Sequence, residues 1–391
     1  MKQAVILAAG EGLRLRPFTV NKPKAMISIA GKPVIQYVLE ALAANGIRDI
    51  ILVVGYQKEQ IFDYVSDGKQ FGVEVKYIHQ EHLLGTGHAL AQAEGSTDEE
   101  FLVLAGNKLI KAETIEQIVK TNPPSILIKT VKDPCGYGVV VFKDGKIAGI
   151  VEKPSRALSS HINTGIYALN RQVFRYLRSE LALPEAINQM LARGENMNVV
   201  ETEQTWLDIV YPWDILTLNA LLLQNIKSFQ NGIIEAGVHL QGNVSIGKDT
   251  LIRSNSYIVG PVVIGKGCEI GPNVCIFPSS SIGDNVTVGS FTEINNCVIE
   301  TDVHINSQCL VRDSVIDNGS VIGSQFTTIS EEADVKVDHE FHRVKTGVML
   351  GRSCRIGSAV TAEAGTIIGN YCQVRPLKLV SGTIADRSLV V

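Results

Sequence analysis

The stretch AVILAAGEGLRLRPFT occupies residues 4–19 and determines the first structural unit expected in the N-terminal half of the chain. Its first four residues form an apolar, β-branched run of the length expected for a buried strand. Gly10 and Gly12 then let the backbone turn sharply and approach a ligand closely. Successive N–H groups in such a turn bind anions, and Arg14 and Lys24 add cations at its rim. The stretch therefore predicts a strand followed by a phosphate-binding loop.

Composition and length bound the class of protein. The 391 residues are 45% hydrophobic and 19% charged, with a net charge of −4, which is typical of a globular chain of two domains. The acidic balance argues against a nucleic-acid partner, and no apolar stretch has the length of a membrane span. We expect no signal peptide, and the seven cysteines include no CxxC pair. We therefore expect a cytoplasmic protein whose thiols are buried.

The N-terminal half alternates helical and strand patterns. Apolar residues at helical spacing follow Pro33 as far as Leu42, and Gly46 suits the end of that helix. Strands are expected at Ile50–Val54 and Val73–Ile78, with a helix over 57–66 between them. Further strands are expected at 101–105, 125–131 and 138–142. This alternation predicts a Rossmann-like α/β domain with a largely parallel sheet and a ligand at the strand C-termini.

Polar motifs follow several of these strands. In QEHLLGTGHA, residues 80–89, the glycines at 85 and 87 favour either a loop whose main chain reads a nucleobase with Gln80 or an ordinary helix N-terminus. The strand FLVLA is followed by Asn107, at the sheet edge where a metal ligand would lie. Glu152 and Asn163 can pair with hydroxyl groups and Lys153 with an anion, although each is also common as an ordinary loop residue.

The motifs together resemble those of the sugar-1-phosphate nucleotidyltransferases. The pattern LAAGxGxRxxPxT followed by PK, then GTGHA, EKP, NTGIY and WxD, occurs in family order over residues 1–225. The resemblance implies a nucleoside triphosphate and a sugar-1-phosphate as substrates, with Mg²⁺ as cofactor. It assigns triphosphate binding to Gly10, Gly12 and the catalytic Arg14 and Lys24; base reading to Gln80, Gly85 and Thr86; sugar-phosphate binding to Gly138, Glu152, Lys153, Asn163 and Thr164; and metal binding to Asn107 and Asp208.

Asn107 departs from the family pattern, where the position is the aspartate of a Gly-Asp pair. An amide offers Mg²⁺ one neutral carbonyl in place of a hard, anionic oxygen. Lys108 stands beside it.

The C-terminal half, residues 226–391, has a period of six. Isoleucine or valine recurs at 246, 252, 258, 264, 270, 276, 282, 288 and 294. Neither a helix nor simple strand alternation gives that period, whereas a coil with three short flat faces does. A polar insertion over about 328–348, expected to be a loop, interrupts the repeat, which returns at Leu350. The pattern resembles the hexapeptide-repeat left-handed parallel β-helix, whose prisms form trimers and often bind acyl-CoA.

The order of the two domains resembles bifunctional uridylyltransferase/acetyltransferase proteins of the archaeal type. Ser307 and Leu310 stand where that family has the histidine base and the tyrosine of its acetyltransferase segment. Serine is no base near neutral pH, and His304 should point elsewhere. His339 and His342 lie in the insertion and either reach a neighbouring cleft or are solvated.

We therefore expect a nucleotidyltransferase that uses UTP or dTTP with glucose- or N-acetylglucosamine-1-phosphate, assembled as a homotrimer or a multiple of one. The departures at Asn107, Lys108 and Ser307 keep two alternatives open. One is a catalytically impaired regulatory or scaffolding paralogue, and the other is an acyltransferase that binds acetyl-CoA on the β-helix.

Overall fold

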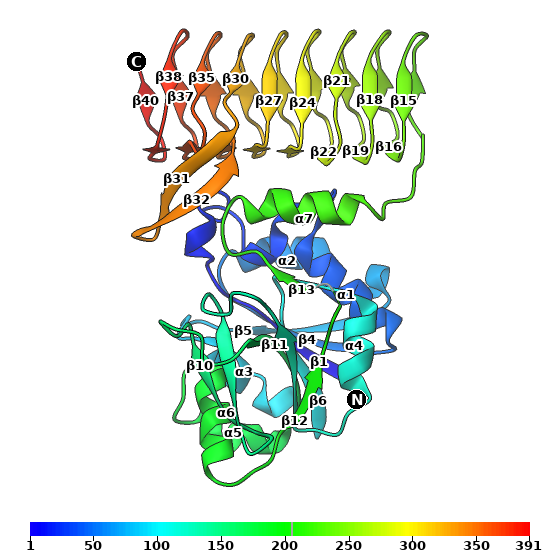
Figure 1. Ribbon diagram of the computed structural model, residues 1–391. Coiled ribbons are helices and arrows are strands. Elements are labelled where there is room, and N and C mark those ends of the chain that lie inside the picture. Colours follow the sequence, from blue (N-terminus) through cyan, green and yellow to red (C-terminus); the bar gives the residue numbers. More distant parts are fainter. Residues whose placement is uncertain (205) are drawn as a thin grey trace. The chain divides into compact units, whose positions relative to one another are not determined.

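The computed structural model describes residues 1–204 and 206–391, which divide into two compact units (Figure 1). The first unit comprises Met1–Glu11, Asn21–Ile27 and Pro33–Asp208. The second comprises Gly12–Val20, Ser28–Lys32 and Ile209–Val391. Two short N-terminal segments therefore belong to the same compact unit as the C-terminal repeat.

The first unit is an α/β domain. Its helices are α1 (Val34–Ala44), α2 (Lys58–Val65), α3 (Thr86–Ala91), α4 (Ala112–Val119), α5 (Phe174–Leu177) and α6 (Leu183–Ala192). Its strands are β1 (Gln3–Ala8), β4 (Asp49–Val54), β5 (Glu74–His79), β6 (Glu100–Ala105), β7 (Lys108–Ile110), β8 (Ser125–Thr130), β9 (Gly138–Lys143), β10 (Lys146–Glu152), β11 (His161–Asn170), β12 (Asn198–Glu201) and β13 (Trp206–Asp208). The short β2 (Ser28–Ile29) lies in the second unit, and β3 (Lys32–Pro33) begins at the last residue of that segment and ends at Pro33, where the first unit resumes.

The main sheet of this unit is mixed. Its strand order is β10-β9-β11-β6-β1-β4-β5, with β8 and β12 extending from β11. Strands β6, β1, β4 and β5 are parallel, whereas β11 runs antiparallel to β6, β8 and β9. The α/β class is thus confirmed, and the parallel character is concentrated in the four strands around β1.

Helices cover both faces of the sheet. Alternate residues of β1 point to opposite faces, so Ala4 and Ile6 pack with α1, α2 and α4 while Val5 packs with α3, α5 and α6. These three side chains are fully buried, which explains why β1 is apolar from Ala4 to Ala8. The predicted elements from Pro33 to Ile78 are confirmed to within one or two residues, and a turn at Asp144-Gly145 joins β9 to β10. No helix among the described residues is long and apolar enough to cross a membrane.

The second unit is built around a prism of three parallel sheets. One sheet contains β14 (Ile233–Ile234), β17 (Leu251–Ile252), β20 (Glu269–Ile270), β23 (Thr287–Val288), β26 (His304–Ile305), β29 (Val321–Ile322), β34 (Arg355–Ile356), β37 (Gln373–Val374) and β40 (Leu389–Val390). The next contains β15 (His239–Gln241), β18 (Tyr257–Val259), β21 (Cys275–Ile276), β24 (Glu293–Asn295), β27 (Leu310–Arg312), β30 (Thr327–Thr328), β35 (Thr361–Ala362) and β38 (Leu379–Val380). The third contains β16 (Val244–Ile246), β19 (Val262–Ile264), β22 (Ser280–Ile282), β25 (Val298–Ile299), β28 (Val315–Ile316), β33 (Met349–Leu350), β36 (Ile367–Ile368) and β39 (Thr383–Ile384).

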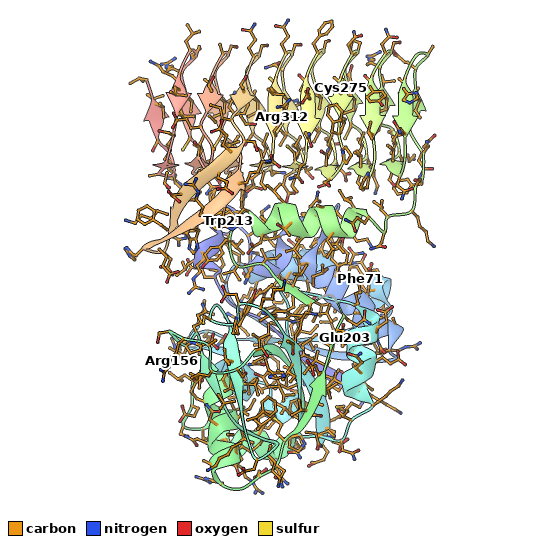
Figure 2. All side chains as sticks on the ribbon, viewed as in Figure 1. Phe71, Arg156, Glu203, Trp213, Cys275 and Arg312 are labelled. Atoms are coloured by element: carbon orange, nitrogen blue, oxygen red, sulfur yellow. The ribbon has the colours of Figure 1, made fainter. Side chains whose placement is uncertain are left out.

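The hexapeptide period places one aliphatic residue of each short strand inside this prism. Successive coils pair Ile252 with Ile270 and Ile270 with Val288, and these side chains are buried. The predicted β-helix is confirmed, and its three faces account for the period of six. All seven cysteines are free thiols, and five of them lie buried in the prism wall, as predicted. Figure 2 labels Cys275 on β21 and Arg312 on β27, two strands of the same sheet of the prism.

A helix and a hairpin complete the second unit. Helix α7 (Asp214–Leu223) contacts β22 and β25, and its buried Asn219 accepts hydrogen bonds from the Ala30 N–H at 2.9 Å and the Ser281 hydroxyl at 2.8 Å. The same side chain donates to the Ser279 carbonyl at 2.8 Å. The insertion predicted as a loop is an antiparallel hairpin of β31 (Glu331–Val337) and β32 (Glu340–Thr346).

Candidate functional site

Asp208 is the centre of a charged cluster in the first unit. Strand β13 pairs antiparallel with β7, and this register places Asp208 directly opposite Lys108. The Lys108 ammonium lies 2.5 Å from Asp208 Oδ2, and the Lys24 ammonium lies 3.3 Å from Oδ1. Asn107 Nδ2 donates to the same Oδ1 at 2.8 Å. Three residues that the sequence singled out therefore converge on one carboxylate.

The electrostatics of the cluster favour an ionised carboxylate. The Asp208 side chain is 15% exposed, and burial alone would raise its pKa, but the adjacent Lys108 and Lys24 lower it below the usual value for an aspartate. One carboxylate faces two ammonium groups, so the side chains of Asp208, Lys24 and Lys108 together carry a net positive charge. Among the described residues, no three His, Cys, Asp or Glu side chains gather into a group able to hold a metal ion.

Lys108 is fixed from several sides. Its ammonium lies 4.7 Å from the centroid of the Trp206 ring, within the range of a cation–π contact. The Trp206 indole N–H in turn donates to the Thr164 carbonyl at 3.1 Å. The Lys108 Cε atom is 3.9 Å from the position that a Cβ at Gly165 would take. Sequence reasoning noted Lys108 only as a neighbour of Asn107, because nothing in the sequence reveals that β7 and β13 pair across about a hundred residues.

The loop after β5 is packed more closely than the sequence predicted. A Cβ at Gly85 would lie 2.5 Å from the Leu181 carbonyl oxygen, and Gly85 has φ 136°. The N–H groups of Gly87 and His88 both donate to that Leu181 carbonyl, at 2.8 and 3.0 Å. The Gly87 N–H is therefore already paired and not accessible to a nucleobase, and the segment forms the N-terminus of α3, the second of the two alternatives that the sequence left open.

The polar side chains of the same loop are also engaged. Gln80 is buried, and its amide nitrogen lies 3.2 Å from the Gly85 carbonyl and 2.9 Å from His88 Nδ1. The Thr86 hydroxyl accepts from the Leu183 N–H at 3.1 Å. These contacts fix the shape of the loop at residues 85–88.

Residues assigned to the sugar phosphate lie around β9, β10 and β11. The register of β9 and β10 places Glu152 opposite Gly138, and a Cβ at Gly138 would lie 2.8 Å from Glu152 Oε2. Lys153 follows with φ 41°, an uncommon conformation for a residue with a side chain, and its N–H donates to the Tyr137 carbonyl at 3.1 Å. Glycine at position 138 thus leaves room for the Glu152 carboxylate.

Asn163 and Thr164 shape the turn within β11. Asn163 accepts from the Gly165 N–H at 2.8 Å and donates to the Tyr167 hydroxyl at 2.6 Å. Burial raises the pKa of that Tyr167 phenol, which stays protonated. The Thr164 side chain is buried and donates to the Leu127 carbonyl at 2.6 Å, so its hydroxyl supports the core.

The beginning of the predicted phosphate-binding loop, at Gly10, is open. Gly10, which follows β1, has no atom within 4 Å of the place where a Cβ would stand. The protein itself therefore does not require glycine at position 10, and close approach of a ligand remains a reason for it.

The continuation of that loop belongs to the second unit. Gly12 has φ 71° and precedes the 3-10 helix η1 (Leu13–Leu15), and the Thr19 hydroxyl donates to the Gly12 carbonyl at 2.7 Å. Arg14 Nε lies 3.3 Å from Asp338 Oδ2 at the tip of the β31–β32 hairpin. No local pattern in the sequence indicates this contact, which joins residues 324 positions apart.

The histidines of the second unit are dispersed. His304 lies exposed on β26, away from Ser307 in the following turn. His342 packs its ring on Tyr211, with centroids 4.3 Å apart, and on Trp213, which lies beside the hairpin at the start of α7 (Figure 2). His342 thus contributes to packing within its own chain.

The fold is an α/β domain with a charged cluster at Asp208, joined in sequence to a β-helix, and comparison with known proteins gives the family. The profile of the family described as "Nucleotidyl transferase" matches residues 3–225, and that of the "GMPPB C-terminal domain" matches residues 258–348. The chain belongs to the nucleotidyl transferase family.

Several relatives are similar over nearly the whole chain. The "Bifunctional protein GlmU" of Methanocaldococcus jannaschii is 33% identical, with 99% of this chain and 97% of the relative covered. The "Bifunctional sugar-1-phosphate nucleotidylyltransferase/acetyltransferase" of Sulfurisphaera tokodaii is 34% identical, covering 99% and 98%. A "Glucose-1-phosphate thymidylyltransferase" of Streptomyces antibioticus is 32% identical, covering 77% and 88%.

A solved structure is similar to part of the chain. That structure is of a protein from Bacillus anthracis assigned as a glucose-1-phosphate thymidylyltransferase. It matches this chain with a TM-score of 0.53 and 26% sequence identity. The match covers 58% of this chain and 97% of that protein.

Proposed function

We propose that this protein is an enzyme that forms a nucleoside diphosphate sugar and pyrophosphate from a nucleoside triphosphate and a sugar-1-phosphate. The observation that carries the proposal is the match of residues 3–225 to the nucleotidyl transferase family, extended by a relative that matches over 99% of the chain and is named for sugar-1-phosphate nucleotidylyl transfer. An α/β sheet with its ligand-binding residues after the strands is a suitable scaffold for this reaction.

The chemistry requires little from the protein beyond positioning and charge neutralisation. A phosphate oxygen of the sugar-1-phosphate attacks the α-phosphorus in line, and pyrophosphate leaves from the opposite side. No protein nucleophile is needed, because the attacking oxygen is already anionic. The cluster at Asp208 supplies positive charge of the kind that the transferred phosphoryl group needs.

Each group of predicted residues has a part in this proposal. We assign triphosphate binding to Gly10, Gly12, Arg14 and Lys24; base reading to Gln80, Gly85 and Thr86; and sugar-phosphate binding to Gly138, Glu152, Lys153, Asn163 and Thr164. Because the Thr164 hydroxyl and the Gly87 N–H are used inside the fold, Thr164 acts by shaping its loop and Gly87 by allowing the loop to pack.

Members of this family use a divalent metal, and the resemblance implies Mg²⁺ held by Asn107 and Asp208. The residues present do not fit a bound Mg²⁺. Asp208 Oδ1 accepts from Lys24 and Asn107, and its Oδ2 accepts from Lys108. Mg²⁺ prefers anionic oxygen ligands, whereas this cluster has one carboxylate and a net positive charge.

The nucleotide is proposed to be UTP or dTTP and the sugar glucose or N-acetylglucosamine. The GTGHA loop favours a uridine or thymidine base, and the Streptomyces antibioticus relative is named for thymidylyl transfer to glucose-1-phosphate. We further propose that the β-helix assembles the chain as a homotrimer or a multiple of one. An acetyltransferase activity is not proposed, because Ser307 stands where the base is needed.

Pyrophosphate release from a panel of substrates tests the proposal. The four nucleoside triphosphates and dTTP are each combined with glucose- or N-acetylglucosamine-1-phosphate, with and without Mg²⁺. Release that depends on both substrates is expected. Nucleotide binding without release from any pair would instead indicate the regulatory paralogue, and thiol release from acetyl-CoA would indicate an acyltransferase.

A further inference from the structure

We infer that the Lys108 ammonium takes the place of a protein-bound divalent cation, so that this site binds a nucleoside triphosphate without a metal ion held by the chain. The inference rests on the proposed function, and it assigns a role to a residue for which the resemblance provides none. Any Mg²⁺ that arrives bound to the triphosphate counts as part of the substrate.

The backbone fixes Lys108 at the position where charge is needed. Because Lys108 and Asp208 are direct partners in the β7–β13 ladder, the 2.5 Å ion pair follows from the strand register. The lysine side chain is 13% exposed and rests against the Trp206 ring, which restricts its movement. An ordinary surface lysine samples many rotamers, whereas this ammonium is held in place before any ligand binds.

The neighbouring substitution is consistent with the same role. Two carboxylates at 107 and 208 would repel one another and require a cation between them. Asparagine at 107 removes one of these charges and donates its own N–H to Asp208. One carboxylate, one amide donor and two ammonium groups form a set that is satisfied without a metal ion. A divalent cation entering this set would have to displace Lys108 from Oδ2 against the repulsion of Lys24.

The Lys108 ammonium can assist the transfer step by supplying positive charge. In that step the sugar-phosphate oxygen forms a bond to the α-phosphorus, the bond from that phosphorus to the bridging oxygen breaks, and pyrophosphate leaves with the electron pair. No proton, oxidant or reductant is required. An ammonium has three N–H donors and interacts with phosphate oxygens as a point charge, so Lys108 can neutralise the developing charge while still paired with Asp208.

Metal binding and nucleotide binding are measured separately on the full-length protein. Mn²⁺ alone is titrated and followed by electron paramagnetic resonance, and binding of UTP and dTTP is followed by calorimetry in EDTA. The variants are Lys108→Met, the charge-conserving Lys108→Arg, and the double variant Asn107→Asp with Lys108→Asn. Lys120→Met is the matched control, because Lys120, the C-cap residue of α4, is an exposed lysine that also pairs with a carboxylate, that of Glu116.

We expect the wild type to bind no Mn²⁺ at a defined site and to bind a triphosphate equally well in EDTA and in Mg²⁺. Lys108→Met should weaken triphosphate binding in EDTA by about tenfold or more, and Lys108→Arg should retain most of it. The double variant should acquire Mn²⁺ binding and make nucleotide binding depend on the ion. Thermal midpoints identify any variant that has not folded, and the wild-type titrations need no variant at all.

Two outcomes separate this inference from the proposed function. Stoichiometric Mn²⁺ binding by the wild type, or triphosphate binding that EDTA abolishes, would overturn the role of Lys108 while pyrophosphate release could still be observed. Metal-free nucleotide binding that requires Lys108, with no pyrophosphate release from any pair, would support the role of Lys108 and overturn the transferase.

Discussion

Replacing Asp208 by asparagine removes the one carboxylate that Lys24 and Lys108 share. The two ammonium groups, which are 23% and 13% exposed, then face each other across a neutral amide. Removing one partner of a fully buried pair costs about 3–5 kcal/mol. Because these side chains retain some contact with solvent, we expect Asp208→Asn to lower the free energy of unfolding by about 2–3 kcal/mol. In a unit of this size that loss corresponds to a fall in the thermal midpoint of about 4–12 °C.

Thermal and urea unfolding at pH 7.5 measure this loss in a double-mutant cycle. The double variant Lys108→Met with Asp208→Asn removes both charges, so its loss should be smaller than the sum of the two single losses by at least about 1 kcal/mol. If Asp208→Asn costs under about 0.5 kcal/mol, or if the two changes are additive, the ion pair does not stabilise the fold and the reasoning fails.

The same carboxylate predicts a pH dependence. The folded-state pKa of Asp208 is lowered below its unfolded value, so its stabilising contribution is complete above about pH 4 and is lost as the pH falls through the lower, folded-state pKa. The difference in free energy of unfolding between wild type and Asp208→Asn should therefore be constant from neutral pH down to about pH 5 and shrink below about pH 4. A difference that is unchanged or larger in acid would contradict the assigned direction.

Three further predictions concern the second unit. Asn219→Ala removes three hydrogen bonds made by a buried amide and should cost about 2–4 kcal/mol in urea unfolding, whereas the exposed Asn225→Ala should cost almost nothing; equal losses would refute a role for the buried amide. Asp338→Ala releases Arg14 and should lower KM for the triphosphate severalfold at nearly constant stability, while Asp334→Ala, which breaks an ion pair within the same hairpin, should not; an unchanged KM would show that the contact is irrelevant to binding. Light scattering of the full chain at micromolar concentration should give a trimer or a multiple of one, and a monomer or isolated dimer would contradict the assembly.

Local rules explain why much of this fold was predictable. The period of six requires an aliphatic residue at each inward position, and no other regular structure uses that spacing. The buried strand β1 could be predicted because helices cover both of its faces, so its sequence is a continuous apolar run. Motif order along the chain then placed Asp208 and Asn107 in one site, and the structure brings them within a hydrogen bond of each other.

The features that sequence reasoning missed depend on long-range pairing or on unusual turn chemistry. The β31–β32 hairpin turns through Asp338 and His339, both with positive φ of 51° and 69°, where asparagine or aspartate followed by glycine is the usual signal. A polar segment without glycine at its turn therefore resembled a loop. The position of Lys108 against Asp208 follows from a strand register that no local pattern specifies.

Transfer of isotope from a labelled sugar-1-phosphate tests the central claim most directly. Glucose- or N-acetylglucosamine-1-phosphate carrying ¹⁸O in its three non-ester phosphate oxygens is incubated with UTP or dTTP, and the products are analysed by mass spectrometry. If a sugar-phosphate oxygen attacks the α-phosphorus, the nucleoside diphosphate sugar contains all three labelled oxygens and the pyrophosphate contains none. Labelled pyrophosphate, or no nucleoside diphosphate sugar from any substrate pair despite bound nucleotide, would contradict the account.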